Sequence, residues 1–273
     1  MSMSASAATV RAGPLRLPRI LGPASGFTLI EMAVVLVVVA LVLGSLLVPL
    51  AGQVEQRRID GTAQTLDQAR DALLAFAAAR GRLPCPAGTA NGQEMLTTNS
   101  ATGDCASFWG YLPAATLGLS PLDAEGFARD GWGLNQNRIR YAVRNATVAS
   151  QNYVFTKTGG IRAAGMPAFN GVQFLYVCNS GTGVTPGADC GGALTLTSEA
   201  VAVVWAVGPN AALPAGGAGA DEAENPNPNG GSADRIFVSR SRATGTANEY
   251  DDQMVWITPP ILFQRMIAAG QLP

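Results

Sequence analysis

Residues 27–51 read FTLIEMAVVLVVVALVLGSLLVPLA, an apolar run interrupted by a single charged residue, Glu31. As an α-helix, these roughly 25 residues would measure about 37 Å, against about 30 Å for the hydrocarbon core of a bilayer. The run is longer than the apolar core of a secretory signal peptide, and no clear small-x-small cleavage site follows Leu50. We therefore predict a single helix that spans a membrane and stays in the mature protein.

The charges on the two sides of this run predict its orientation. Residues 1–26 carry three arginines and no acidic residue, and positively charged flanks tend to stay in the cytoplasm. Arg57 and Arg58 lie beyond the run and argue slightly against this orientation, but neighbouring acidic residues partly offset them. We expect a cytoplasmic leader over 1–26, a single inner-membrane span, and a periplasmic head over 85–273.

Glu31 lies about one turn into this otherwise apolar segment. An ionisable side chain inside a membrane helix costs about 2.5–3.5 kcal/mol at mid-span on insertion scales, and less near the surface. Such a residue generally has a function and a partner. The alternative is that the carboxylate simply reaches water at the cytoplasmic surface.

Residues 25–31, SGFTLIE, together with the apolar run that follows, closely resemble the cleavage motif of type IV prepilins and of type II secretion pseudopilins. The resemblance implies that a membrane aspartyl peptidase, the prepilin peptidase, cuts after Gly26 and methylates the new terminus at Phe27. Thr28, Leu29 and Glu31 then fall in the assembly segment. The implied partners are the peptidase, an inner-membrane assembly platform and other pilin-like subunits.

Each position of this motif also has a physical explanation. Glycine before the cut lets the backbone extend into a protease cleft without a side chain to clash. Cleavage frees a positively charged amine on Phe27. In a filament whose helices are shifted along their axes, the Glu31 carboxylate can pair with the Phe27 amine of a neighbour, so that two costly groups offset each other. We therefore predict that Glu31 acts in assembly and not in catalysis.

Gly44 and Pro49 interrupt the same helix. Proline removes one backbone hydrogen bond, and glycine lowers the helical preference around it. The resemblance to pilins implies that the helix loosens here in assembled filaments. A simple kinked membrane helix is the alternative.

The helical pattern continues past the apolar run to about Arg80, where Gly81 and Pro84 predict its end. Residues 52–84 should form an amphipathic half that buries its apolar face against a sheet.

Short β-branched or aromatic runs, bounded by turn residues, predict the strands. The predicted class is α+β, with a long N-terminal helix on an antiparallel sheet of four to six strands, as in pilins. The expected strands are Ile139–Val143, Tyr153–Thr156, Val172–Cys178, Ala200–Val207, Arg235–Ser239 and Met254–Ile257. The C-terminal run from Pro259 should form a short amphipathic helix or a closing strand that packs on the core.

The chain has four cysteines, none of them in a Cys-x-x-Cys pair, so neither zinc-ribbon nor redox-motif spacing is met. Disulfides are favoured if the head lies outside the cytoplasm. Three connectivities are possible, and we favour Cys85 with Cys105 and Cys178 with Cys190, because each pair closes a short loop. Buried free thiols remain the alternative.

Residues 209–232 read PNAALPAGGAGADEAENPNPNGGS. This composition buries too little apolar surface to offset the entropy lost on ordering, which predicts a mobile loop. An exposed binding loop is the alternative.

Acidic residues in the head offer ligands for a hard cation. Asp130, in RDGWG, resembles the Asp-x-Trp-Gly run of major pseudopilins, a resemblance that implies calcium bound through oxygen ligands nearby. Further carboxylates would come from Asp251 and Asp252, or from Asp221, Glu222 and Glu224 in the predicted mobile loop. No EF-hand spacing is present, and aspartate in glycine-rich sequence is more often a turn former.

Composition excludes several classes of function. The formal net charge is −1, so no global field favours nucleic acid. The chain has no histidine and a single lysine, Lys157, which removes the commonest general base and most nucleophilic arrangements. We therefore expect a filament subunit that is not an enzyme, serving protein secretion or pilus biogenesis. The alternative is a membrane-tethered binding head, adhesin or enzyme on a signal anchor.

Overall fold

The computed structural model describes residues 26–212, 219–225, 235–245 and 248–273. The side chains of 45–51, within a helix, also lie outside the described part. The chain divides into two compact units, Met1–Ala51 and Gly52–Pro273, and each is described by itself.

Helix α1 runs over Leu29–Arg80, which confirms the long N-terminal helix. Its end also falls where predicted. Gly81 adopts a left-handed backbone conformation with φ of 68°, and its N–H donates to the carbonyl of Ala77. Glycine adopts this conformation without steric cost, which explains why the helix ends at this residue.

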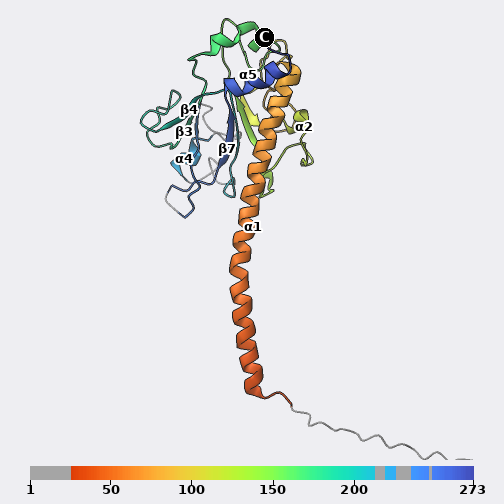
Figure 1. Cartoon of the computed structure of the whole chain (residues 1–273), viewed down its shortest axis with the longest axis vertical. Helices are drawn as coiled ribbons and strands as arrows, with labels where there is room; N and C mark the ends of the chain where they lie inside the picture. The colour runs from red at the N-terminus through yellow and green to blue at the C-terminus, as the bar shows by residue number, and fades with distance from the viewer. Residues whose placement is uncertain (1–25, 213–218, 226–234, 246–247) are drawn as a thin grey trace, which may run out of the picture. The chain divides into compact units, whose positions relative to one another are not determined.

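The second unit contains a four-stranded antiparallel sheet in the order β1-β2-β5-β7. Figure 1 labels its edge strand β7 and the helix α1. Buried residues from the second half of α1, including Leu66 and Leu73, share one core with this sheet. The predicted packing of the amphipathic half of the helix on an antiparallel sheet is therefore confirmed. The strands are β1 (Trp109–Tyr111), β2 (Arg140–Val143), β5 (Ala202–Ala206) and β7 (Gln253–Ile257).

A second, three-stranded sheet has the order β4-β3-β6, with β3 and β6 parallel. Its strands are β4 (Thr195–Ala200), β3 (Leu175–Cys178) and β6 (Ile236–Val238). Phe237 of β6 packs edge-on against Trp205 of β5, with ring centroids 5.2 Å apart. The unit therefore has three layers: the second half of α1, the four-stranded sheet and the three-stranded sheet.

Strand β5 lies between the other two layers and is buried on both faces. Val204 belongs to the core shared with α1, whereas Val203 and Trp205 belong to the core between the sheets. Successive side chains of a strand point to opposite faces. This position explains why the sequence from 200 to 207 is continuously apolar and does not alternate.

The remaining elements are short, apart from the C-terminal helix α5 (Pro259–Ala268). Leu262 and Met266 of α5 are buried in the core that also contains α1, so the C-terminal run forms a helix and not a strand. The others are α2 (Ala114–Leu117), η1 (Asn135–Asn137), α3 (Gly160–Ala164), η2 (Met166–Phe169) and α4 (Ala220–Ala223).

The strand predictions were only partly correct. Residues 153–156 form turns, because Tyr153 has a φ of 52° and its carbonyl accepts hydrogen bonds from Thr156 and Lys157. Val154 and Phe155 are fully buried in these turns, so their apolar character reflects core packing and not strand pairing. Strands β1 and β4 were not predicted: β1 has three residues and contains a glycine, and β4 is largely exposed. Two sheets replace the expected single one.

Two predictions for the N-terminal part concern residues that the structure describes only in part. Of the helices it describes, none combines the length and the apolar character needed to cross a bilayer. The predicted span 27–51 includes the side chains of 45–51, which lie outside the described residues, as does the predicted leader up to residue 25.

Candidate functional site

The start of α1 is closed by a reciprocal pair of hydrogen bonds between Thr28 and Glu31. The backbone N–H of Glu31 donates to Thr28 Oγ1 at 3.3 Å, and the backbone N–H of Thr28 donates to Glu31 Oε2 at 3.5 Å. This is a capping box, in which two N–H groups that a helix start leaves unpaired find side-chain acceptors. Sequence analysis missed this role, although the Thr-x-x-Glu spacing before an apolar run is its known signature.

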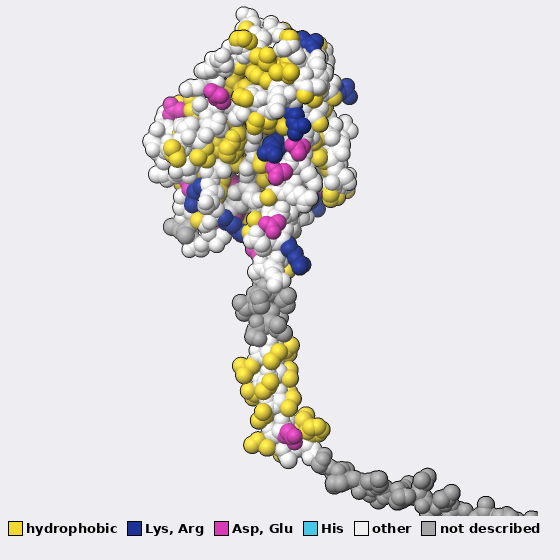
Figure 2. All heavy atoms as spheres, in the orientation of Figure 1, with side chains coloured by type: hydrophobic (Ala, Val, Ile, Leu, Met, Phe, Trp, Pro, Cys, Tyr) yellow, Lys and Arg dark blue, Asp and Glu magenta, His cyan; other side chains and the backbone are white. Residues whose placement is uncertain are grey.

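The residues around the predicted cut are exposed. Phe27 is 76% exposed and Leu29 is 93% exposed, and the described apolar side chains of α1 up to Leu43 are all exposed. Figure 2 shows hydrophobic side chains along this part of the helix on the face in view. A Cβ added at Gly26 would meet no atom within 4 Å. Any requirement for glycine at this position therefore does not come from packing within the described structure.

Gly44 and Pro49 both lie within α1. A Cβ at Gly44 would meet no atom within 4 Å, so packing does not explain this glycine either. The side chain of Pro49 lies outside the described residues. The loosening of the helix at these positions stays a prediction.

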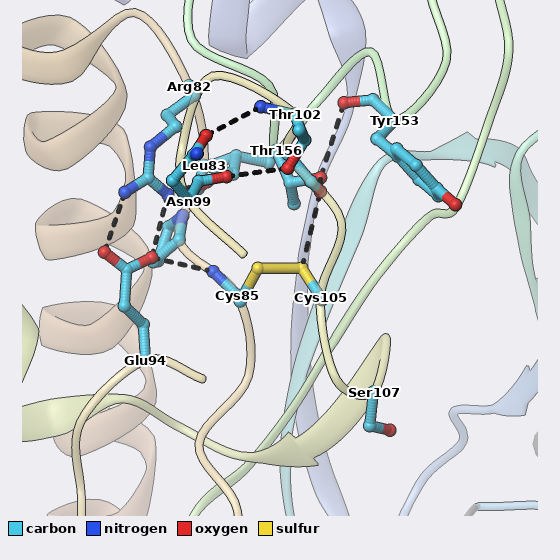
Figure 3. The surroundings of a disulfide bond; sticks show 12 residues. Arg82, Leu83, Cys85, Glu94, Asn99, Thr102, Cys105, Ser107, Tyr153 and Thr156 are labelled. Carbon is cyan, nitrogen blue, oxygen red and sulfur yellow. Dashed lines mark hydrogen bonds and ion pairs between the residues drawn. A yellow bond between two sulfur atoms is a disulfide. The ribbon is translucent and has the colours of Figure 1, made fainter. Parts of the chain in front are cut away.

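Both predicted disulfides are present, Cys85 with Cys105 and Cys178 with Cys190. Figure 3 shows the first, which adjoins an ion pair between Arg82 and Glu94. Two nitrogens of the Arg82 guanidinium donate to the two Glu94 oxygens at 2.7 and 2.8 Å, and the N–H of Cys85 donates to Glu94 Oε2 at 3.2 Å. The disulfide and this bidentate pair together fasten the segment that leaves α1 to the loop after it.

Asp130, the first residue of the predicted cation site, organises a turn that contacts α1. Its Oδ1 accepts the N–H of Trp132 at 2.9 Å, and its Oδ2 accepts Nδ2 of Asn137 at 2.8 Å. Burial raises the pKa of Asp130 to about 6, against the opposing effect of these hydrogen bonds. The next residue, Gly131, donates its N–H to Thr62 Oγ1 of α1 at 2.9 Å.

The structure brings Asp251 and Asp252 together with Glu222, and not with Asp130 as predicted. Ligand oxygens of these three carboxylates all lie within 4.8 Å of one another. Asp130 instead keeps both its oxygens on the turn of residues 130–137. The predicted set of cation ligands is corrected accordingly, because Asp130 has the turn-forming role that aspartate commonly takes.

Glu222 comes from α4, within the stretch for which composition predicts a mobile loop. Residues 219–225 of that stretch are described and differ from a structureless loop, because Asp221, Glu222 and Asn225 are each 1% exposed. Polar contacts hold these residues in place. The loop prediction was based on low apolar content, which gives no information about polar contacts. Residues 213–218 and 226–232 lie outside the described part.

Hydrogen bonds fix the three carboxylates in place. Glu222 accepts the N–H of Asp251 at 2.8 Å and Nδ2 of Asn210 at 2.9 Å, and Asp252 accepts Nδ2 of Asn225 at 2.6 Å. Burial, reinforced by the charge of Glu222, raises the pKa of Asp251 to about 7. Burial likewise raises the pKa of Asp252 well above its usual range, against the effect of the Asn225 hydrogen bond.

Comparison with known proteins identifies one feature of the chain. Residues 23–47 match the family model of the prokaryotic N-terminal methylation motif. No curated protein and no solved structure matches the chain. The motif implies a membrane-anchored precursor that a peptidase processes and that assembles with other pilin subunits. With an α+β architecture consistent with a pilin-like fold, the motif supports a type IV pilin-like prepilin or pseudopilin.

Proposed function

We propose that this protein is the precursor of a filament subunit, either a pseudopilin of a type II secretion system or a minor type IV pilin. In this proposal the prepilin peptidase cuts after Gly26 and methylates Phe27, and an inner-membrane platform assembles the subunit through its N-terminal helix. The head over 85–273 lies in the periplasm and has no enzymatic activity. The observation that carries the proposal is the methylation motif at residues 23–47.

The character of the first part of α1 supports assembly through the helix. Its described apolar side chains up to Leu43 are exposed, and exposed apolar surface of this extent generally marks contact with a membrane or a protein. A lipid bilayer before assembly and the helices of other subunits afterwards would cover it in turn.

The two disulfides support a periplasmic head. Disulfides persist in oxidising compartments and are rare in the cytoplasm. All four cysteines of the chain are paired, as expected for a domain that folds after translocation.

The proposal is tested by mass spectrometry of the N-terminus of protein isolated from its native host. We expect a mature chain that begins with methylated Phe27 and lacks the first 26 residues of the precursor. The matched variant replaces Gly26 with valine, at a position where an added Cβ would meet no atom within 4 Å. This variant should retain its leader, because a branched side chain next to the scissile bond obstructs the protease cleft. A wild-type chain that retains residues 1–26, or is cut beyond the apolar run, would refute the proposal.

A further inference from the structure

An apolar groove of about 370 Å³ lies between η2 and the first turn of α5. It belongs to the end of the head where α1 terminates. Arg162 of α3 donates to the carbonyls of Gly270 and Gln271, and a Cβ at Gly81 would lie 3.0 Å from Gln271 Oε1. These contacts bring the end of α1, the helix that precedes η2 and the residues that follow α5 together.

The floor of the groove is a pair of aromatic rings that the core holds in place. Phe169 and Phe263 line the groove and pack edge-on, with ring centroids 5.1 Å apart. Phe169 is itself buried, and its ring also packs on those of Phe155 and Phe174, which are fully buried. Close-packed interiors resist rearrangement, so this floor keeps its shape whether or not a ligand is present.

Three prolines, Pro167, Pro259 and Pro260, line the same groove. The ring of proline fixes φ, and its side chain has almost no rotamer freedom to lose. An apolar surface that is already ordered binds a ligand at little cost in entropy. Pro167 and Pro260 are exposed, so the groove is open to solvent along its rim.

Two polar side chains on the rim, Glu199 and Asn170, also line the groove. Both are exposed, and neither side chain forms an ion pair or a hydrogen bond with any residue that the structure describes. Glu199 is the only charged residue among those lining the groove. A carboxylate without a counter-charge beside an apolar surface favours a ligand that carries a positive charge next to an apolar group. The amide of Asn170 can both donate to and accept from a peptide backbone.

The shape of the groove favours a peptide over a small molecule. Pockets for small molecules generally enclose about 70–90% of the ligand surface, whereas this groove has an exposed rim. Open grooves lined by aromatic side chains are a recurring way of binding extended peptides. We propose that this groove binds an extended peptide segment of a partner protein, with an apolar side chain on the rings of Phe169 and Phe263 and a neighbouring arginine or lysine at Glu199.

The position of the groove leaves it accessible in an assembled subunit. Assembly through the N-terminal helix would use the start of α1, whereas the groove lies where α1 ends. Figure 2 shows hydrophobic side chains gathered at the end of the head where Figure 1 labels α5. The proposal concerns the head alone and does not depend on the processing of the N-terminus, so failure of one proposal leaves the other intact.

The test is fluorescence polarisation with labelled, end-capped peptides and the full chain in lipid nanodiscs. Each peptide places a leucine or phenylalanine close to an arginine within a Gly-Ser sequence, and a matched set replaces the arginine with glutamate. We expect saturable binding of the arginine set, about tenfold tighter than of the glutamate set. Glu199→Lys should reverse this preference. Asp67→Lys is the control, because Asp67 lies on α1 with its side chain 58% exposed, and it should leave the preference unchanged.

Phe263→Ala tests the apolar floor and should weaken binding about tenfold, because it removes one of the two rings. Melting of each variant without peptide separates loss of the groove from loss of the fold, and Glu199→Lys, at an exposed residue, should melt like the wild type. Absence of saturable binding by every peptide at about 1 mM would overturn the proposal. So would equal affinity for the arginine and glutamate sets, or a preference that Glu199→Lys leaves unchanged.

Discussion

At the scale of single residues, Glu31 has two distinct roles to consider. Its carboxylate closes the start of α1 through the capping box with Thr28, and under the proposed function its charge pairs with the Phe27 amine of a neighbouring subunit. The first role needs only a side-chain acceptor, which Gln supplies as well as Glu. The second role needs the negative charge. Two substitutions therefore separate them.

We predict that Glu31→Gln leaves cleavage and helix capping intact but prevents most incorporation into filaments, because only the charge is lost. Thr28→Ala should have the opposite effect. It removes the cap, at about 1 kcal/mol of helix stability, but keeps the charge and so should still permit incorporation. The measurement is the fraction of mature subunit recovered with sheared filaments. Normal incorporation of Glu31→Gln, or an equal defect in Thr28→Ala, would show that the charge is not what matters.

At the scale of elements, the packing of α1 on the head includes a close backbone contact at Gly131. A Cβ at Gly131 would lie 2.2 Å from the carbonyl oxygen of Arg58 in α1, and the N–H of Gly131 donates to Thr62 Oγ1. Thr62 Oγ1 in turn donates to the Arg58 carbonyl at 2.8 Å. Only glycine allows the turn that begins at Asp130 to approach the helix this closely.

We predict that Gly131→Ala destabilises the head by about 1–3 kcal/mol, the usual cost of forcing an extra carbon into a packed contact. Gly61→Ala is the matched control, because Gly61 lies in α1 and a Cβ there would meet no atom within 4 Å. This control should be neutral or stabilising by up to about 1 kcal/mol. Urea denaturation followed by circular dichroism measures both. Equal free energies of unfolding for the two variants would mean that the turn can move away from α1 without loss of stability.

At the scale of the whole molecule, the described core clusters of the second unit consist of residues of that unit alone. The buried residues of α1 that share the core with the sheet begin at Leu66. The described side chains before Gly44 are exposed. The described apolar side chains at the start of the helix do not belong to this core, and under the proposed function a membrane or other subunits cover them.

We predict that residues 52–273 expressed alone in an oxidising compartment fold with both disulfides formed. The expected result is a cooperative thermal transition, no reactive thiol and no binding of a hydrophobic dye. The same fragment with Leu73→Ala should lose about 2–5 kcal/mol, because Leu73 is fully buried. A fragment that binds dye and melts without a cooperative transition would show that the first 51 residues do contribute to the fold.

The sequence by itself determined the features that depend on neighbouring residues. It predicted α1 and its end at Gly81, because helical periodicity and a terminating glycine are local signals. It also predicted the motif at Gly26, Phe27 and Glu31, and both disulfides, each of which closes a short loop. Strands with a continuous apolar run, such as β5, were predicted because such a run is also a local signal.

Only the tertiary structure decided which distant residues meet. Glu222 joins Asp251 and Asp252 because α4 packs beside the start of β7, a contact between segments about 30 residues apart that no local pattern records. Division into two sheets likewise depends on strand pairing at long range, and β4 gives little signal because most of its side chains are exposed. Residues 153–156 were wrongly predicted to form a strand. A buried turn and a buried strand both require apolar side chains, so the sequence pattern does not distinguish them.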